Sequence, residues 1–152
     1  MESATGSDVP SRNLRVLLVE DDEHQRNLLA WMLRSEGCSV VEATSGVQLL
    51  EWIGVVTSSP QRMIDVVVSD IMMPDLTSIE VLSGWRFGRW FVPLVVVTAH
   101  DDPSLWADAY ALGATAVLQK PVQATDLRDA IDRAVVQGRV EAGLRRRDTV
   151  QN

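Results

Sequence analysis

Short runs of aliphatic residues that end in polar side chains constrain the fold of this chain more than any other feature. Four clear runs cover residues 14–19, 64–68, 92–97 and 116–118, and a weaker one covers 38–41. The runs are rich in Val and Leu and do not alternate with polar residues, which is typical of strands buried on both faces of a parallel sheet. We therefore expect five buried strands.

Segments with the apolar spacing of a helix separate these runs. In residues 23–36, Leu28, Leu29 and Met32 fall on one face, and the segment stops at Gly37. Four similar segments follow, marked by apolar positions within 47–53, 79–85, 105–112 and 127–135. Five strands alternating with five helices predict a (βα)₅ protein of the α/β class, with a doubly wound sheet.

Length and charge indicate one acidic domain with a basic end. The 152 residues carry a net charge of −7, whereas residues 138–152, with four arginines and two acidic residues, carry +2 and leave −9 on the remainder. An acidic body repels the phosphate backbone, so we expect no nucleic acid binding by the main domain. We expect residues 1–13 to form a flexible tail, 14–137 the folded domain, and 138–152 a basic helical extension or linker.

Two features missing from the sequence indicate the compartment. No apolar run approaches the ~20 residues that span a bilayer, and residues 1–13 lack the basic and apolar regions of a signal peptide. We therefore expect a cytoplasmic protein without membrane contact. The single cysteine, Cys38, cannot form an internal disulfide, and we expect it to be a small apolar residue that enters a strand.

Polar residues stand where the predicted strands end. Asp21 and Asp22 follow the first strand, Asp70 ends the third, Thr98 ends the fourth, and Lys120 follows the fifth. In open α/β sheets, ligands bind beyond the carboxyl ends of the strands. These five side chains should therefore meet at one edge of the sheet.

Such a group suits phosphoryl transfer. Crowded carboxylates repel one another unless a cation lies among them, and Mg²⁺ prefers oxygen ligands. A carboxylate such as that of Asp70 can attack phosphorus, provided that a metal and an ammonium group neutralise the phosphoryl oxygens. Lys120 is the only lysine among the 14 basic residues, and its compact charge suits a phosphoryl oxygen better than the planar fork of arginine.

Four motifs carry a resemblance to a known family. In chain order they are Val19-Glu20-Asp21-Asp22, Asp70-Ile71-Met72-Met73-Pro74-Asp75, Val97-Thr98-Ala99 and Gln119-Lys120-Pro121. Together, in this order and at these spacings, they are highly specific. Over roughly residues 13–137 the chain resembles the receiver domain of bacterial two-component response regulators.

The resemblance implies a flavodoxin-like sheet of strand order 2-1-3-4-5 with helices on both faces. It implies a signalling domain rather than an enzyme, with no activity beyond self-phosphorylation from a donor and autodephosphorylation. The donor would be a sensor histidine kinase or a phosphotransfer protein of a phosphorelay. Phosphorylation would switch a partner-binding surface formed by the fourth helix, fifth strand and fifth helix, a face that is also a candidate for homodimerisation.

The resemblance also assigns roles at the site. It makes Asp70 the phosphoacceptor, places Thr98 and Lys120 in contact with the phosphoryl group, and implies a cis peptide bond before Pro121.

For Mg²⁺, the resemblance implies four protein ligands. Asp22 would bind the ion directly, Asp21 would bind it directly or through water, and Asp70 and the backbone carbonyl of Met72 would complete the set.

The chain departs from the family pattern in two places, a single residue and a residue pair. The family commonly has an aromatic residue three positions before the lysine, where this chain has Val117, and an Asp-Gly pair where this chain has Thr77 and Ser78. We expect Ser78 to cap the third helix. Val117 favours an alternative function, a phosphorylation-independent interaction or dimerisation module, whereas the acidic residues and Lys120 speak against it.

Two further features stay open. His100, two residues after Thr98, is a candidate modulator of the phosphorylation site, or an exposed loop residue without a role. The segment 84–91 is rich in aromatic residues and arginine, which are typical of interaction hot spots, but such residues also fill protein cores.

Overall fold

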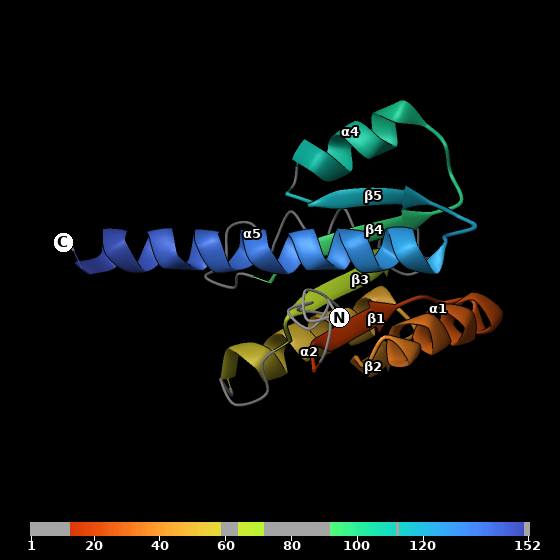
Figure 1. The fold of residues 1–152 in the computed structure, drawn as a ribbon, viewed down its shortest axis with the longest axis horizontal. Coiled ribbons are helices and arrows are strands. Elements are labelled where there is room, and N and C mark those ends of the chain that lie inside the picture. The colour runs from red at the N-terminus through yellow and green to blue at the C-terminus, as the bar shows by residue number, and fades with distance from the viewer. Residues whose placement is uncertain (1–12, 59–63, 72–91, 112, 151–152) are drawn as a thin grey trace, which may run out of the picture.

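The computed structural model describes residues 13–58, 64–71, 92–111 and 113–150, and these contain one five-stranded parallel sheet (Figure 1). The strand order is β2-β1-β3-β4-β5, as predicted. The strands are β1 (Arg15–Val19), β2 (Ser39–Ala43), β3 (Val66–Asp70), β4 (Leu94–Thr98) and β5 (Ala116–Gln119). All four neighbouring pairs are parallel, so the carboxyl ends of the strands share one edge of the sheet.

Helices cover both faces of this sheet, which confirms the α/β prediction. The described helices are α1 (Glu23–Ser35), α2 (Gly46–Ser58), α4 (Pro103–Ala111) and α5 (Ala124–Val150). Residues of α1 and α5 share one core cluster with the strands, and residues of α2 and α4 share the other. The helix predicted within 79–85 lies outside the described residues. None of the described helices has both the length and the apolar character that crossing a membrane requires.

The continuous aliphatic runs follow from this layered arrangement. Side chains alternate between the two faces of a strand, and both faces are covered here. In β1, Val16 and Leu18 belong to the cluster under α1 and α5, whereas Leu17 and Val19 belong to the cluster under α2 and α4. All four are fully buried, and burial of each such side chain contributes about 1.5–3 kcal/mol.

The last helix continues well past the sheet. α5 extends to Val150, and Figure 1 shows its C-terminal part running beyond the ends of the strands. Gly138 lies where the helix passes the start of β4, since a Cβ there would come within 3.1 Å of Pro93. Residues 138–150 are therefore helical, whereas the division of the chain into a tail, a domain and an extension or linker stays a prediction.

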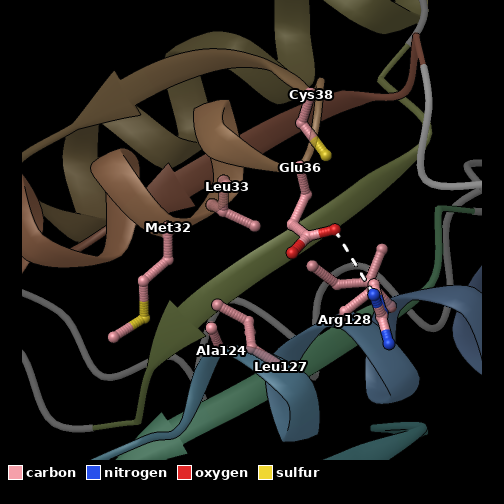
Figure 2. A pocket seen from close by; sticks show the side chains of 8 residues that line it. Met32, Leu33, Glu36, Cys38, Ala124, Leu127 and Arg128 are labelled. Atoms are coloured by element: carbon pink, nitrogen blue, oxygen red, sulfur yellow. Dashed lines mark ion pairs between the residues drawn. The ribbon is translucent and has the colours of Figure 1, made fainter.

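Cys38 lies in the core, beside a small pocket between α1 and α5. Figure 2 shows this pocket, lined by Met32, Leu33, Glu36, Cys38, Ala124, Leu127, Arg128 and Ile131. An ion pair joins Glu36 to Arg128, with 3.7 Å between the charged atoms. Burial raises the pKa of the Cys38 thiol to about 11.

This pKa predicts low thiol reactivity in the folded protein. Only the thiolate attacks a disulfide reagent, so a pKa near 11 instead of 9 should lower the rate at pH 8 about a hundredfold relative to urea-unfolded protein. The rate should rise about tenfold per pH unit until the pH nears the pKa. Equal rates in the folded and unfolded protein would contradict the buried position of Cys38.

Burial of the β1 side chains predicts how much a truncation in this strand lowers the stability of the fold. Leu18→Ala removes a fully buried side chain and should lower the free energy of unfolding by about 2–5 kcal/mol in a urea titration. Leu50→Ala is the matched control, since Leu50 is 46% exposed and its loss should cost less than about 1 kcal/mol. Similar losses for both variants would contradict the described core.

Candidate functional site

Four polar side chains meet at the carboxyl edge of the sheet. Glu20 directly follows β1, Asp70 is the last residue of β3, Thr98 is the last residue of β4, and Lys120 directly follows β5. Because the strands are parallel, these residues share one end of the sheet despite their distance in sequence. This is the edge at which the sequence predicts the site.

Three carboxylates form a compact acidic cluster there. Glu20, Asp21 and Asp70 each place one carboxylate oxygen within 4.8 Å of the other two. Glu20 is buried with 1% exposure, Asp21 is exposed, and Asp70 is half-buried. The cluster thus has a buried floor and an open side. Its oxygen donors suit a hard divalent cation such as Mg²⁺.

Lys120 bridges two of these carboxylates. Its Nζ donates a hydrogen bond to Asp70 Oδ2 at 2.9 Å and another to Glu20 Oε1. Burial raises the pKa of Glu20 despite the opposing effect of Lys120. Burial alone would lower the pKa of Lys120, but the carboxylates of Glu20 and Asp70 outweigh it, so this pKa lies above its ordinary value. Lys120 is therefore charged at neutral pH.

Asp22, expected as a direct Mg²⁺ ligand, is the N-cap of α1. Its carboxylate accepts a hydrogen bond from the backbone N–H of Gln25 at 3.0 Å, and this bond lowers the pKa of Asp22. The acidic residue that the structure adds to Asp21 and Asp70 is Glu20. The spacing from Asp22 to Gln25 is that of a helix capping box. This sequence signal could have identified Asp22 as a helix cap and left Glu20 as the candidate metal ligand.

Thr98 lies under the same edge. It is fully buried, and its Oγ1 accepts a hydrogen bond from the backbone N–H of His100 at 3.1 Å. Its backbone carbonyl accepts one from the N–H of Lys120 at 2.8 Å, which ties β4 to the residue after β5. The peptide bond between Lys120 and Pro121 is cis, as the sequence analysis expected.

The structure also describes His100 and Val117, two other residues that the sequence analysis singled out. His100 is exposed, and its main chain donates a hydrogen bond to Thr98 Oγ1 and accepts one from Trp106 Nε1. Val117, at the position where the family commonly has an aromatic residue, is 8% exposed and packs in the cluster under α2 and α4. Met72, Thr77, Ser78 and the segment 84–91 lie outside the described residues.

An open groove leads away from the acidic cluster. It runs between the start of α1 and the Pro121 turn, and its apolar lining includes Leu28, Leu29, Met32 and Val122. The groove leaves the cluster accessible along α1, and Leu28 on its rim is 46% exposed.

Comparison with known proteins identifies this arrangement. The response regulator receiver domain family matches residues 16–132, most of the chain. The chain belongs to this family. Receiver domains of two-component response regulators are signalling domains, and the parallel sheet with its polar carboxyl edge is accordingly that of a receiver.

Individual relatives agree. Ethylene receptor 2 of Arabidopsis thaliana is 32% identical over 127 residues, which cover 83% of this chain and 16% of that protein. Transcriptional regulatory protein FixJ of Rhizobium meliloti is 31% identical over 119 residues, 78% of this chain and 55% of that protein. The chain thus spans only part of these two relatives. A response regulator receiver domain protein from Clostridium thermocellum superposes with a TM-score of 0.72 at 27% identity, covering 84% of this chain and 98% of that one.

Proposed function

We propose that this receiver accepts a phosphoryl group on Asp70, with Mg²⁺ bound beside it, and so relays a signal. The observation that carries the proposal is the ammonium group of Lys120, 2.9 Å from Asp70 Oδ2 and next to the acidic cluster. A nucleophilic carboxylate with a cation on one side and oxygen donors for a metal on the other is what transfer to an acyl phosphate needs.

The acidic cluster supports the metal assignment. Three carboxylate oxygens within 4.8 Å of one another repel each other unless a cation lies among them. We propose that Glu20, Asp21 and Asp70 hold Mg²⁺, and that the backbone carbonyl of Met72 adds a ligand. When bound, the ion would neutralise charge on the carboxylates and on the incoming phosphoryl oxygens. Asp22 keeps its role as helix cap in this proposal.

The transfer step uses three residues of this chain. A carboxylate oxygen of Asp70 attacks the phosphorus of a phosphohistidine, so that a P–O bond forms as the P–N bond breaks. The imidazole of the donor keeps the electron pair and takes up a proton. Lys120 exchanges its carboxylate partners for a phosphoryl oxygen, and the hydroxyl of Thr98 donates its hydrogen to another oxygen.

The donor would be a sensor histidine kinase or a phosphotransfer protein that approaches along the groove beside α1. Leu28 on the rim of this groove, 46% exposed, offers an apolar contact. The face formed by α4, β5 and α5 would bind the output partner or a second copy. Hydrolysis of the acyl phosphate would reset the domain, and we place the protein in the cytoplasm.

One observation favours a second function. Val117 occupies a buried position at which the family commonly has an aromatic residue, which fits an interaction or dimerisation module that works without phosphate. A Mg²⁺ titration monitored by tryptophan fluorescence separates the two functions. A phosphoacceptor should change its fluorescence as Mg²⁺ binds, whereas an interaction module that works without phosphate should show no change.

Asp70→Asn tests the acceptor. Acetyl phosphate and Mg²⁺ should add one phosphoryl group to the wild type, detected by intact mass, and none to the variant, because an amide does not form the acyl phosphate. Asp22→Asn is the matched control: it removes a neighbouring carboxylate but keeps a good helix cap, so labelling should persist. Undiminished labelling of Asp70→Asn would overturn the assignment.

Glu20→Gln tests the proposed ligand set. It should weaken Mg²⁺ binding at least about tenfold in a calorimetric titration, because a ligand oxygen loses its charge. Asp22→Asn should change the affinity less than about twofold, since its side chain serves the helix. If Asp22→Asn lost affinity and Glu20→Gln did not, the ligand would be Asp22, as the sequence analysis expected.

A further inference from the structure

Two aromatic side chains of α4, Trp106 and Tyr110, form hydrogen bonds with the main chain of neighbouring segments. The indole Nε1 of Trp106 donates a hydrogen bond to the backbone carbonyl of His100 at 2.9 Å. The hydroxyl of Tyr110 accepts one from the backbone N–H of Val117 at 3.1 Å. Trp106 and Tyr110 are four residues apart, so they lie on the same face of α4.

The first of these hydrogen bonds leads back to Thr98. His100, whose carbonyl accepts the hydrogen bond from Trp106, also donates its own N–H to Thr98 Oγ1 at 3.1 Å. Thr98 is fully buried and ends β4 at the same sheet edge as Asp70. The turn between β4 and α4 is thus held by a hydroxyl at the site on one side and by an indole on the other.

The second hydrogen bond reaches the edge of the sheet. β5 is an outer strand, and the main-chain groups of such a strand that face away from its neighbour need other partners. The Tyr110 hydroxyl supplies one for Val117. Val117 pairs with Val96 of β4 and packs in the same cluster as Ala109 of α4. A shift of α4 therefore changes the packing of β5.

We infer that Trp106 and Tyr110 couple Thr98 to the edge of β5, so that a change at the Thr98 hydroxyl alters the position of α4. These two residues act by positioning and do not touch the phosphoryl group. That phosphorylation of Asp70 triggers the change rests on the proposed function. In the bond from the His100 N–H, Thr98 Oγ1 accepts through a lone pair, so its one hydrogen can go to a phosphoryl oxygen. The movement of the Thr98 side chain toward that oxygen stretches the bond from the His100 N–H.

The coupling can be tested without phosphate. Thr98→Val removes the hydroxyl but keeps the side-chain shape, and should speed amide hydrogen exchange at Val117 about fivefold in the otherwise wild-type chain, the loss expected for one hydrogen bond. In a Trp106→Phe background the same change should alter exchange less than about twofold, because the connecting indole is gone. Thr98→Ser should restore the wild-type rate.

Matched controls separate coupling from general loosening. Trp31→Phe removes a tryptophan on α1 that is 66% exposed, and in that background Thr98→Val should keep its full effect. Exchange at Val68, in the middle of the sheet, should be equal in all variants. If Thr98→Val leaves Val117 unchanged, or changes it equally with and without Trp106, the inference is wrong.

A second experiment measures the same hydrogen exchange after phosphorylation. After treatment with acetyl phosphate and Mg²⁺, the wild type, Trp106→Phe and Tyr110→Phe should all gain one phosphoryl group by intact mass, but only the wild type should change its exchange at Val117. A matching change in both variants would overturn the inference. Absence of labelling in the wild type would instead contradict the proposed function, while the exchange comparison on unphosphorylated protein would still decide the coupling.

Discussion

The ammonium group of Lys120, between the carboxylates of Glu20 and Asp70, is the interaction on which the organisation of the site depends. Glu20 is 1% exposed, and a buried carboxylate without a cationic partner is costly by several kcal/mol. Three strands must end at one edge for this contact to form, since the residues belong to the ends of β1, β3 and β5. The parallel sheet is thus the means by which distant residues share a cation.

The same contact leaves the site short of positive charge. Within the described part of the chain, Lys120 pairs with two of the three clustered carboxylates, those of Glu20 and Asp70, and the third, Asp21, is exposed on the open side. Under the proposed function, this imbalance favours a divalent cation, and a metal together with Lys120 then favours a phosphoryl group. A lysine suits the position because its amine can move from carboxylates to phosphoryl oxygens, whereas an arginine would hold a planar carboxylate in a fixed pair.

The strands of the sheet and the edge that carries the site could be predicted from the sequence, for a physical reason. A strand covered on both faces must be aliphatic throughout, so the runs that became β1, β3 and β4 stood out, and the polar residues after them marked the edge. The choice between Glu20 and Asp22 depends on which acid the end of β1 turns inward and which one begins α1. Composition does not separate two acids this close in the chain, and the signal that does is the capping-box spacing from Asp22 to Gln25. The partners of Trp106 and Tyr110 are backbone groups of other segments, and no sequence pattern identifies those.

The central claim is that the carboxylate of Asp70 becomes an acyl phosphate. Borohydride reduces an acyl phosphate to the alcohol, which converts the phosphorylated aspartate into homoserine and so marks it in a peptide map. After treatment with acetyl phosphate and Mg²⁺, reduction should place homoserine at position 70, and omission of Mg²⁺ should remove most of the signal. Reduction products at Asp21 or Glu20, with position 70 unchanged, would contradict the account.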